Sequence, residues 1–360
     1  MTEAYAVILA GGKGERFWPL STSRRPKQLV TLVGDEPLLA QSVTRLKGLI
    51  PPERICVITN DDLVDACRQA VPELPKNNII GEPVGRDTAA AAALGAVWVK
   101  AQNPDAVFCI LTADHVIGDL DVYRATLRES FALAHRERVL ITIGITPTEP
   151  STGYGYIEGG DLYARNGTVE FLEARRFVEK PDQKTAESYI ASKRFFWNSG
   201  MFIWSVAAFE EGVRTHRPSL TSIFDELLPC VGTVSFPSQL AETYDRLEKI
   251  SIDYALMEKA NNIIMVRGTF SWDDVGAWPA LENHFERDED NNVSIGDCKA
   301  VDADGNIVYS KDRLTALVGV SNLVVVQSDG VTLICPRDRA QDIKQLVSKL
   351  KETGRYDDLL

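Results

Sequence analysis

A glycine-rich stretch followed by basic residues is the first feature of this sequence that could do chemistry. It reads "AGGKGER" over residues 10–16 and directly follows the apolar run "YAVIL", which is typical of a buried strand. Five cations stand in or just after it: Lys13, Arg16, Arg24, Arg25 and Lys27. Glycine backbone amides and nearby cations together hold phosphate oxygens. The stretch therefore predicts a phosphate site, although a tight turn alone would also explain paired glycines.

Two common phosphate motifs do not fit this stretch. A P-loop requires Gly-Lys-Ser/Thr after four intervening residues, and no such run is present. The dinucleotide-binding fingerprint requires a third glycine, but Phe17 stands at that position. The sequence thus excludes a P-loop enzyme and disfavours a dehydrogenase.

The basic stretch belongs to a longer pattern. It runs Gly11-Gly12-x-Gly14-x-Arg16-x-Trp18-Pro19-Leu20-Ser21 and closes with Pro26-Lys27-Gln28. This pattern resembles the signature of the sugar nucleotidyltransferases, and its Trp18 and Gln28 look most like those of mannose-1-phosphate guanylyltransferases. Further matching segments follow in order: "EPVGRDTAAA" (82–91), "LTADHVI" (111–117), "GYGYIE" (153–158), "FVEKP" (177–181), "WNSGMF" (197–202), "SIDYALMEK" (251–259) and "FSWDDVGAW" (270–278). The resemblance therefore covers essentially the whole chain.

The resemblance implies a specific reaction, in which GTP and mannose 1-phosphate give GDP-mannose and pyrophosphate. A phosphate oxygen of the sugar phosphate would attack the α-phosphorus of GTP in line. Two anions must meet, so the protein's main task would be charge neutralisation and alignment. No covalent protein nucleophile is needed, and no Ser-His or Cys-His arrangement stands out among the four histidines.

The resemblance also implies roles for the glycine loop and its cations. Arg16 and Lys27 would be catalytic, binding the triphosphate and stabilising charge in the transition state. The glycines and one further lysine would contact the nucleotide: Gly11, Gly12, Lys13 and Gly14. A solvated basic face is the alternative explanation for these cations.

Two aspartates match the family's metal-holding positions. Asp114 follows the strand-like run "VFCILTA", and Asp274 lies in "WDDVGAW". Mg²⁺ prefers a few carboxylates together with phosphate oxygens and water. The resemblance thus implies Mg²⁺ as the cofactor, with Asp273 left as a competitor for the second position. A capping or turn aspartate is the alternative for Asp114, and a structural hydrogen bond is expected for His115.

Residues for the sugar phosphate and the base lie further along the chain. The sugar-phosphate set implied by the resemblance is Gly155, Glu179, Lys180, Asn198 and Asp253. Guanine would be read by the segment 82–88, with nucleotide contacts from Glu82, Pro83, Arg86 and Thr88. Asp87 and Ala90 replace the Asn and Pro that are usual in the family, so the base preference stays open.

Two other functions remain possible. The chain could be another nucleotide-sugar pyrophosphorylase with a different base or sugar. It could also be a non-catalytic regulatory relative, because this fold serves as a binding scaffold too. Such a relative would be expected to have lost a cation or a metal aspartate, yet Arg16, Lys27, Asp114 and Asp274 are all present.

Alternating strand and helix patterns must position these residues. Strand-like runs lie at 5–10, 55–59, 106–111 and 138–143, and helix-like segments at 37–48, 61–70, 88–101 and 121–136. Such alternation predicts an α/β, Rossmann-like fold with a mixed, mostly parallel sheet. Ligands of these folds bind beyond the carboxyl ends of the strands. Residues 145–205 look like hairpins covering one end of the sheet.

The sequence pattern changes after the charged stretch "ERDEDNN" (286–292). Beyond it, short apolar runs alternate with turn residues, and a charged helix follows near 338–353. We therefore expect a nucleotidyltransferase domain over 1–285 and a small C-terminal β domain over 286–360. By resemblance, the second would be a short left-handed β-helix that helps to form a homodimer.

Composition bounds the partners and the compartment. A length of 360 residues favours about two domains, and a net charge of −12 argues against nucleic acid or an anionic membrane as a partner. The six cysteines include no Cys-x-x-Cys pair, and no signal-peptide pattern or membrane-length apolar run is visible. The sequence therefore predicts a cytoplasmic protein, and the resemblance implies GTP and mannose 1-phosphate as its partners.

Overall fold

The computed structural model describes residues 3–360, which divide into two compact units built from interleaved segments of the chain. Unit 1 consists of residues up to Gly11, Ser42–Ala113 and Ile117–Trp272. Unit 2 consists of Gly12–Gln41, Asp114–Val116 and Asp273–Leu360. The proposed domain boundary at residues 285/286 stays a prediction.

Unit 1 is built on a nine-stranded sheet with the order β3-β2-β1-β4-β9-β6-β10-β8-β7. Its strands are β1 (Ala4–Leu9), β2 (Ile55–Asn60), β3 (Ile79–Glu82), β4 (Val107–Thr112), β6 (Leu140–Ile145), β7 (Tyr156–Asn166), β8 (Val169–Val178), β9 (Phe195–Ser205) and β10 (Ile263–Gly268). β3, β2, β1 and β4 are parallel, as are β6 and β10, whereas β9 runs antiparallel between β4 and β6. The predicted mixed α/β fold is confirmed, and the sequence did not indicate β3 or β10. Residues 145–205 do not form a separate cover over one end of the sheet, because β7, β8 and β9 are strands of the sheet itself.

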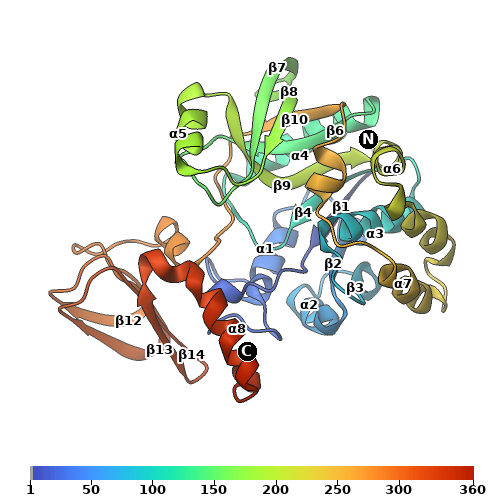
Figure 1. Cartoon of the computed structure of the whole chain (residues 1–360). Coiled ribbons are helices and arrows are strands. Elements are labelled where there is room, and N and C mark those ends of the chain that lie inside the picture. Colours follow the sequence, from blue (N-terminus) through green and yellow to red (C-terminus); the bar gives the residue numbers. More distant parts are fainter. Residues whose placement is uncertain (1–2) are drawn as a thin grey trace. The chain divides into compact units, whose positions relative to one another are not determined.

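Helices cover both faces of this sheet. They are α2 (Val64–Ala70), α3 (Asp87–Gln102), α4 (Leu120–Arg136), α5 (Gln183–Ser192), α6 (Val206–His216) and α7 (Phe236–Asp245). α3 packs on β1 and β2, while α4 packs on β4 and β9 (Figure 1). Phe108 of β4 lies in the core cluster of α3, and its neighbour Cys109 faces Tyr123 of α4. Because side chains alternate along a strand, the two helices lie on opposite faces.

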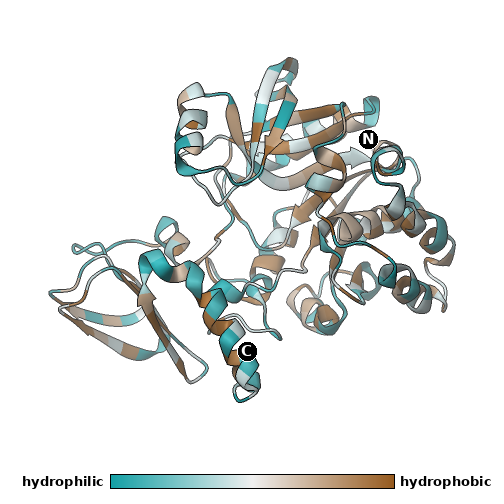
Figure 2. Cartoon of the chain, in the orientation of Figure 1, coloured by the Kyte–Doolittle hydropathy of each residue, from teal (hydrophilic) through white to brown (hydrophobic). Residues whose placement is uncertain are grey.

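Composition explains why α3 is the central helix of its face. Alanine is the strongest helix former, and residues 89–93 are five consecutive alanines. Every residue from Ala89 to Val99 is buried, and the helix is apolar all round (Figure 2). A helix without a polar face belongs in a core rather than at a surface. β3 and α3 thereby fix the two ends of the segment 82–88.

Unit 2 contains a four-stranded sheet with the order β12-β13-β14-β15. The strands are β12 (Val293–Val301), β13 (Ile307–Val318), β14 (Leu323–Ser328) and β15 (Val331–Pro336), followed by α8 (Ile343–Thr353). β12, β13 and β14 are parallel and lie side by side (Figure 1), whereas β15 returns antiparallel to β14. α1 (Leu38–Thr44) and the short strands β5 (Val116–Ile117) and β11 (Trp272–Asp273) lie where the chain passes from one unit to the other.

Buried asparagines join the successive strands of this sheet. Asn292 and Asn306, both almost fully buried, precede β12 and β13. Asn306 Nδ2 donates to Asn292 Oδ1 (2.9 Å) and to the carbonyl oxygen of Val320 (3.1 Å). Asn306 Oδ1 accepts from the Leu323 amide at the start of β14 (3.0 Å). Each side chain therefore satisfies backbone groups at the bends between strands, where the ladder itself cannot.

The glycine-loop segment 12–41 belongs to the core of unit 2. Phe17, Trp18 and Leu20 are buried in one apolar cluster with Trp278 and Tyr309. The Phe17 and Trp278 rings lie 5.1 Å apart, and Trp18 Nε1 donates to the carbonyl oxygen of Leu359 (2.8 Å). The residues after the first strand are thus anchored by the C-terminal part of the chain.

Over residues 3–360, no helix has the length and apolar character required to cross a bilayer.

Candidate active site

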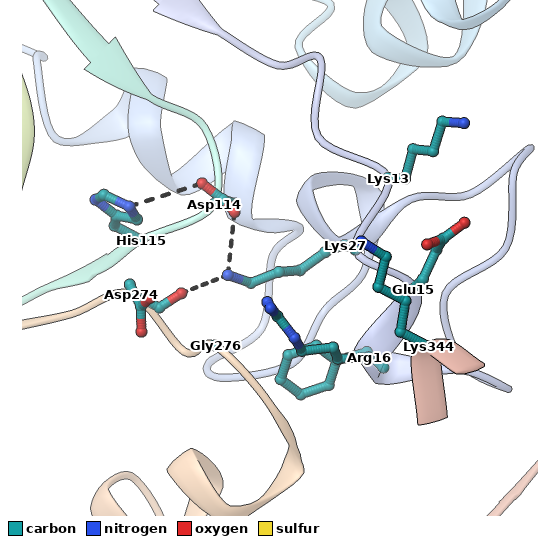
Figure 3. A pocket seen from close by; sticks show the side chains of 11 residues that line it. Lys13, Glu15, Arg16, Lys27, Asp114, His115, Asp274, Gly276 and Lys344 are labelled. Atoms are coloured by element: carbon teal, nitrogen blue, oxygen red, sulfur yellow. Dashed lines mark hydrogen bonds and ion pairs between the residues drawn. The ribbon is translucent and has the colours of Figure 1, made fainter. Parts of the chain in front are cut away.

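A pocket of about 360 Å³ in unit 2 gathers residues from the segment 13–27, from 114–115, from 274–276 and from α8 (Figure 3). It is lined by Lys13, Gly14, Glu15, Arg16, Phe17, Lys27, Asp114, His115, Asp274, Gly276 and Lys344. Four of these side chains are cationic and three are carboxylates. The mixture suits a polyanion together with a metal cation.

Lys27 is the buried cation at the centre of this pocket. It begins a short 3₁₀ turn after Pro26, and its side chain is only 7% exposed. Its Nζ donates to Asp114 Oδ2 (3.1 Å) and to the backbone carbonyl oxygen of Asp274, as Figure 3 shows. The ammonium also lies 5.9 Å from the centre of the Phe17 ring. A desolvated cation held at a fixed point acts more strongly on a nearby anion than one in water.

Gly14 allows the glycine loop to lie against Lys27. Its φ is +62°, in the left-handed region that favours glycine. A Cβ at this position would lie 2.8 Å from the Lys27 backbone nitrogen and closer still to the Lys27 Cβ. The Gly14 carbonyl oxygen also accepts from the Ser21 hydroxyl (2.6 Å). Loop and lysine are therefore packed as one structural element.

Asp114 and Asp274 provide carboxylates on the wall of the pocket. Burial alone raises the pKa of Asp114, but the Lys27 ammonium and His115 outweigh it and lower the pKa below its usual value. Asp114 is thus a carboxylate at neutral pH. His115 Nε2 lies 3.9 Å from Asp114 Oδ1, so it is a neighbour of the carboxylate rather than a hydrogen-bond partner at close range.

The donor set fits a divalent metal that takes most of its ligands from elsewhere. No group of three or more His, Cys, Asp or Glu side chains within residues 3–360 could hold a metal by itself. Two carboxylates in one pocket are what Mg²⁺ uses when substrate phosphates and water complete its shell. A closed protein cage of the structural-zinc type is not present in the described chain.

The other cations of the pocket are more exposed. Arg16 lies at the 3₁₀ turn Glu15–Phe17, and Lys13 precedes Gly14 on the same loop. Lys344 comes from α8, which the sequence indicated only as a charged helix. The apolar face of α8, with Ile343 and Val347 buried, holds the helix in unit 2. No local pattern could have singled out Lys344, because its place depends on long-range packing.

The residues predicted for the sugar phosphate lie together in unit 1. The side-chain Nδ2 of Asn198 donates to Asp253 Oδ1 (2.8 Å), and the backbone amide of Asn198 donates to the Gly155 carbonyl oxygen (2.8 Å). The Glu179 carboxylate forms an ion pair with Lys180 (2.8 Å). A Cβ on Gly155 would lie 2.8 Å from Glu179 Oε2. Residues from four segments thus form one polar cluster.

Electrostatics within this cluster favour a hydrogen-bonding ligand. Burial raises the pKa of Asp253, the Asn198 amide opposes that shift, and the charge of Glu179 adds to it. Glu179 and Lys180 are exposed, so they remain accessible to a ligand. The carboxyl oxygens of Asp253 and Glu179 accept hydrogen bonds and the side-chain amide of Asn198 can both donate and accept, as recognition of sugar hydroxyls requires.

A buried carboxyl marks the start of the predicted base-reading segment in unit 1. Glu82 ends β3 with 6% exposure, and its Oε1 accepts no hydrogen bond from the described residues. A Cβ on Gly11 would lie 3.7 Å from Glu82 Oε2 and 4.0 Å from Asn60 Oδ1. Burial raises the pKa of Glu82 to about 7, against a smaller lowering effect of the Tyr244 hydroxyl. Asn60 and Tyr244 carried no sequence signal as neighbours of this carboxyl.

The remaining predicted nucleotide contacts have structural partners. Arg86 Nε and Nη2 donate to the carbonyl oxygens of Tyr244 (2.9 Å) and Asp245 (2.8 Å). Thr88 Oγ1 accepts from the Ile252 amide (2.9 Å). Pro83 is exposed and lines a separate hollow beside α2, α3 and α7. These contacts hold the segment 82–88 in place, and a nucleotide role for Arg86 and Thr88 stays a prediction.

Comparison with known proteins gives the family. A family model described as "Nucleotidyl transferase" matches residues 5–291, about four fifths of the chain. The chain belongs to the nucleotidyl transferase family. A second model, described as "MannoseP isomerase/GMP-like beta-helix domain", matches residues 296–350 of this nucleotidyl transferase. The β-helix character predicted for the C-terminal strands is confirmed, while its left-handed winding stays a prediction.

Curated relatives are similar over nearly the full chain. The mannose-1-phosphate guanylyltransferase of Escherichia coli K12 is 36% identical over 99% of this chain and 75% of its own length. The enzyme of the same name from Klebsiella pneumoniae is 37% identical over 97% of this chain and 74% of its own length. A crystal structure from Thermus thermophilus, described as a mannose-1-phosphate geranyltransferase, superimposes with a TM-score of 0.86 at 37% identity, covering 97% of this chain and 100% of that one.

The predicted site residues of this nucleotidyl transferase fall into two groups. Lys13, Gly14, Arg16, Lys27, Asp114 and Asp274 line one pocket of unit 2, and Gly12 precedes them on the same loop. Gly11, the base-reading segment and the sugar-phosphate cluster belong to unit 1. Nucleotidyl transferases generally use a divalent metal, which accords with the two carboxylates of the pocket.

Proposed function

We propose that this nucleotidyl transferase transfers GMP from GTP to mannose 1-phosphate, giving GDP-mannose and pyrophosphate. The observation that carries the proposal is the pocket in which a buried lysine pairs with one of two carboxylates beneath a glycine loop. The names of the similar enzymes from E. coli and K. pneumoniae support the choice of substrates. The first alternative is a transferase with another base or sugar, and the second is a non-catalytic relative.

Arg16 and Lys27 would bind the triphosphate and stabilise the charge that develops during transfer. Lys27 is preorganised, since its Nζ is already fixed by Asp114 and the Asp274 carbonyl oxygen. Fixed charges need no reorganisation at the moment of reaction, and they act strongly where water is excluded. Gly11, Gly12 and Gly14 would bring backbone amides close to the phosphates, with Lys13 adding charge at the rim.

Asp114 and Asp274 would hold Mg²⁺. When bound, this ion would neutralise phosphate charge and act as a Lewis acid on phosphoryl oxygens. The chain itself supplies two carboxylate ligands and keeps at least Asp114 ionised through Lys27. Asp273 is not proposed as a ligand, because its carboxylate is engaged by other groups.

Glu82 is proposed to read the base. The Watson–Crick edge of guanine presents two adjacent donors, N1–H and the N2 amino group, and a carboxylate offers two acceptors in matching geometry. The Watson–Crick edges of uracil, thymine, adenine and cytosine lack two adjacent donors, so the same pairing would place an acceptor of the base against one carboxylate oxygen. The buried Oε1 that lacks a partner within the described residues could therefore take a guanine donor.

The cluster of unit 1 is proposed to bind mannose 1-phosphate. Glu179, Asn198 and Asp253 would exchange hydrogen bonds with sugar hydroxyls, Gly155 would let the backbone approach the ring, and Lys180 would pair with the phosphate. Lys180 is the one cation of this set, and its positive φ of +39° turns it away from the regular strand direction.

A single assay separates the three possibilities. The protein is mixed with Mg²⁺, mannose 1-phosphate and each nucleoside triphosphate in turn, and pyrophosphate release is followed. We expect turnover with GTP that exceeds turnover with UTP, dTTP, ATP or CTP. A higher rate with another triphosphate, or with glucose 1-phosphate in place of mannose 1-phosphate, would favour a sister enzyme. No release with any pair would favour the non-catalytic relative.

The assembly and location of the protein are further proposals. We propose a homodimer that forms through the C-terminal strands and acts in the cytoplasm without nucleic acid or membrane partners. The net charge of −12 supports the second part, because it would repel anionic surfaces. Analytical ultracentrifugation of the full chain at micromolar concentration would test the dimer, and a monomer there would contradict it.

A further inference from the structure

Val275 has an unusual backbone conformation directly after the proposed metal ligand Asp274. Its φ is +46°, and its side chain is fully buried in the core of unit 2. A positive φ is a true outlier for a β-branched residue. Such conformations persist only where surrounding groups enforce them, and they cluster at functional sites. The groups that enforce this one are therefore informative.

Asp273 provides the restraint. Its Oδ1 accepts a hydrogen bond from the Val275 amide (2.7 Å), which closes a tight turn around Asp274. Its Oδ2 accepts from Asn283 Nδ2 (3.1 Å) and lies 2.9 Å from His284 Nε2. The Asp273 side chain is only 13% exposed. Three partners therefore fix both oxygens of this carboxylate and leave neither free to rotate toward the pocket.

The turn sets the direction of two groups of Asp274. The Asp274 carboxylate lines the pocket, and its backbone carbonyl oxygen accepts from Lys27 Nζ. On the other side of Val275, a Cβ at Gly276 would lie 3.3 Å from both Asp274 carboxylate oxygens. Rotation of the peptide between Asp274 and Val275 would move the carbonyl oxygen away from Lys27. One strained residue thus links a metal ligand to the central cation.

We propose that Asp273 is a positioning residue which, braced by Asn283 and His284, holds Val275 in its left-handed conformation and thereby fixes Asp274 for metal binding and for Lys27. The inference rests on the proposed metal role of Asp274. It assigns no contact with substrate to Asp273. Groups that orient metal ligands typically change metal affinity by about 10- to 100-fold when removed.

Direct metal binding is the first test. Mn²⁺ binding to the full chain is followed by the EPR signal of the free ion, with GTP present, for the wild type, Asp273→Ala and Asp273→Asn. We expect Asp273→Ala to weaken Mn²⁺ binding at least about tenfold. Asp273→Asn keeps an oxygen for the Val275 amide, so its loss should be clearly smaller. Asp288→Ala is the matched control, because Asp288 also accepts from backbone amides in unit 2 but does not line the pocket, and Mn²⁺ binding should stay as in the wild type.

A double-mutant cycle with Val275→Gly is the second test. Glycine adopts a positive φ without restraint, so Asp273→Ala should weaken Mn²⁺ binding less in the Val275→Gly background than in the wild type. Equal losses in both backgrounds would overturn the proposal, as would wild-type Mn²⁺ affinity in Asp273→Ala. Absence of Mn²⁺ binding by the wild type would also overturn it.

The tests distinguish failure of this inference from failure of the proposed function. Mn²⁺ binding and the cycle need no turnover, so they can support the turn mechanism even if GTP and mannose 1-phosphate do not react. Conversely, Asp273→Ala could bind Mn²⁺ as tightly as the wild type and still turn over GTP. That result would support the proposed function and contradict the positioning role of Asp273. Where Asp273→Ala does not fold, the cycle is run with Asp273→Asn, whose smaller loss of Mn²⁺ affinity should shrink in the Val275→Gly background, and an unchanged loss there would overturn the proposal.

Discussion

Lys27 is buried, and two fixed acceptors hold its ammonium. Loss of this ammonium should therefore lower the reaction rate more than loss of any other pocket cation. We predict that Lys27→Met lowers kcat by about 10²- to 10³-fold, the usual effect of removing one transition-state charge stabiliser. Methionine keeps an unbranched apolar stem of similar length, so the contact with Gly14 should survive. The measurement is pyrophosphate release under saturating substrates.

An exposed lysine provides the control for Lys27. Lys299 of β12 also belongs to unit 2, but it does not line the pocket. Lys299→Met should therefore keep the wild-type rate. A Lys27→Met enzyme that retained activity within about threefold, a loss of under 1 kcal/mol, would rule out the transition-state role.

Glu82 should couple base recognition to pH. Burial raises the pKa of Glu82 from 4.5 to about 7, so near neutrality the free protein is divided between the protonated and ionised forms. Guanine donors require the ionised form. We predict that GTP binding weakens as pH falls through 7, by roughly tenfold at pH 6, in proportion to the ionised fraction. Calorimetric GTP titrations between pH 6 and 8 would measure this dependence.

The substitution Glu82→Gln gives the matching control. It cannot ionise, so the pH dependence of GTP affinity over this range should flatten. Glutamine also places a donor opposite the base, so the preference for GTP over UTP should fall. GTP affinity that follows the same pH curve in the wild type and the variant would show that another group titrates.

The raised pKa of Glu82 should also make the stability of the fold depend on pH. A pKa raised in the folded state means that the folded chain holds this proton more tightly than the unfolded chain, so stability falls as pH rises from about 4.5 to about 7. The full effect is about 3 kcal/mol, from the size of the pKa change. Glu82→Gln should therefore gain stability relative to the wild type as pH rises through this window. Urea denaturation at pH 5 and pH 8 measures the free energy of unfolding of both proteins. An equal difference between variant and wild type at the two pH values would contradict the prediction.

At the scale of elements, the glycine loop depends on its packing against the turn that carries Lys27. Gly14→Ala adds left-handed strain and an overlap with the Lys27 backbone, so we predict a loss of about 2–4 kcal/mol in folding free energy. Gly319→Ala is the matched control, because Gly319 has φ +65° and open space around it. It should cost only about 1–2 kcal/mol of strain. Equal losses in the two variants would mean that the loop can move away from Lys27.

Elements differed in how well the sequence predicted them. The helices 87–102 and 120–136 were expected at 88–101 and 121–136, because long periodic or alanine-rich runs decide their own structure. β3 was missed because Ile79–Glu82 is only four residues long and has just two apolar side chains. Without β3, the sequence could place Glu82 in a segment but could not show that its carboxyl is buried.

Site residues followed the same rule. Lys27, Asp114 and Asp274 stand in local motifs, so the resemblance of these motifs to those of the sugar nucleotidyltransferases was enough to propose them. The Asp273 carboxylate contacts Asn283 and His284, which lie ten and eleven residues further along the chain, beyond most of a 3₁₀ segment. Neither Asn283 nor His284 belongs to a recognisable sequence motif. Sequence reasoning therefore left Asp273 as a rival metal ligand, whereas its contacts point to a supporting role.

At the scale of the whole molecule, the chain passes between the two units five times, after residues 11, 41, 113, 116 and 272. Neither unit is therefore a continuous piece of sequence. The expected boundary at 285/286 would separate Phe17 and Trp18 from half of the buried residues of their apolar cluster, including Tyr309, and Trp18 from the carbonyl oxygen of Leu359. The segment 12–41, which carries the proposed catalytic residues, thus depends on residues near the opposite end of the chain.

Because the two units are interleaved along the chain, the fragment 1–285 should bind GTP more weakly than the full chain. Removal of 286–360 would expose the apolar side of the segment 12–41, so Lys27 and Gly14 would lose the packing that holds their pocket. We expect the fragment to bind GTP at least about tenfold more weakly than the full chain, because only a fraction of molecules would hold a formed pocket. Fluorescence of Trp18 and Trp278 should report a looser environment. Full GTP affinity and an unchanged unfolding transition in the fragment would instead support two independent domains that meet at residue 285.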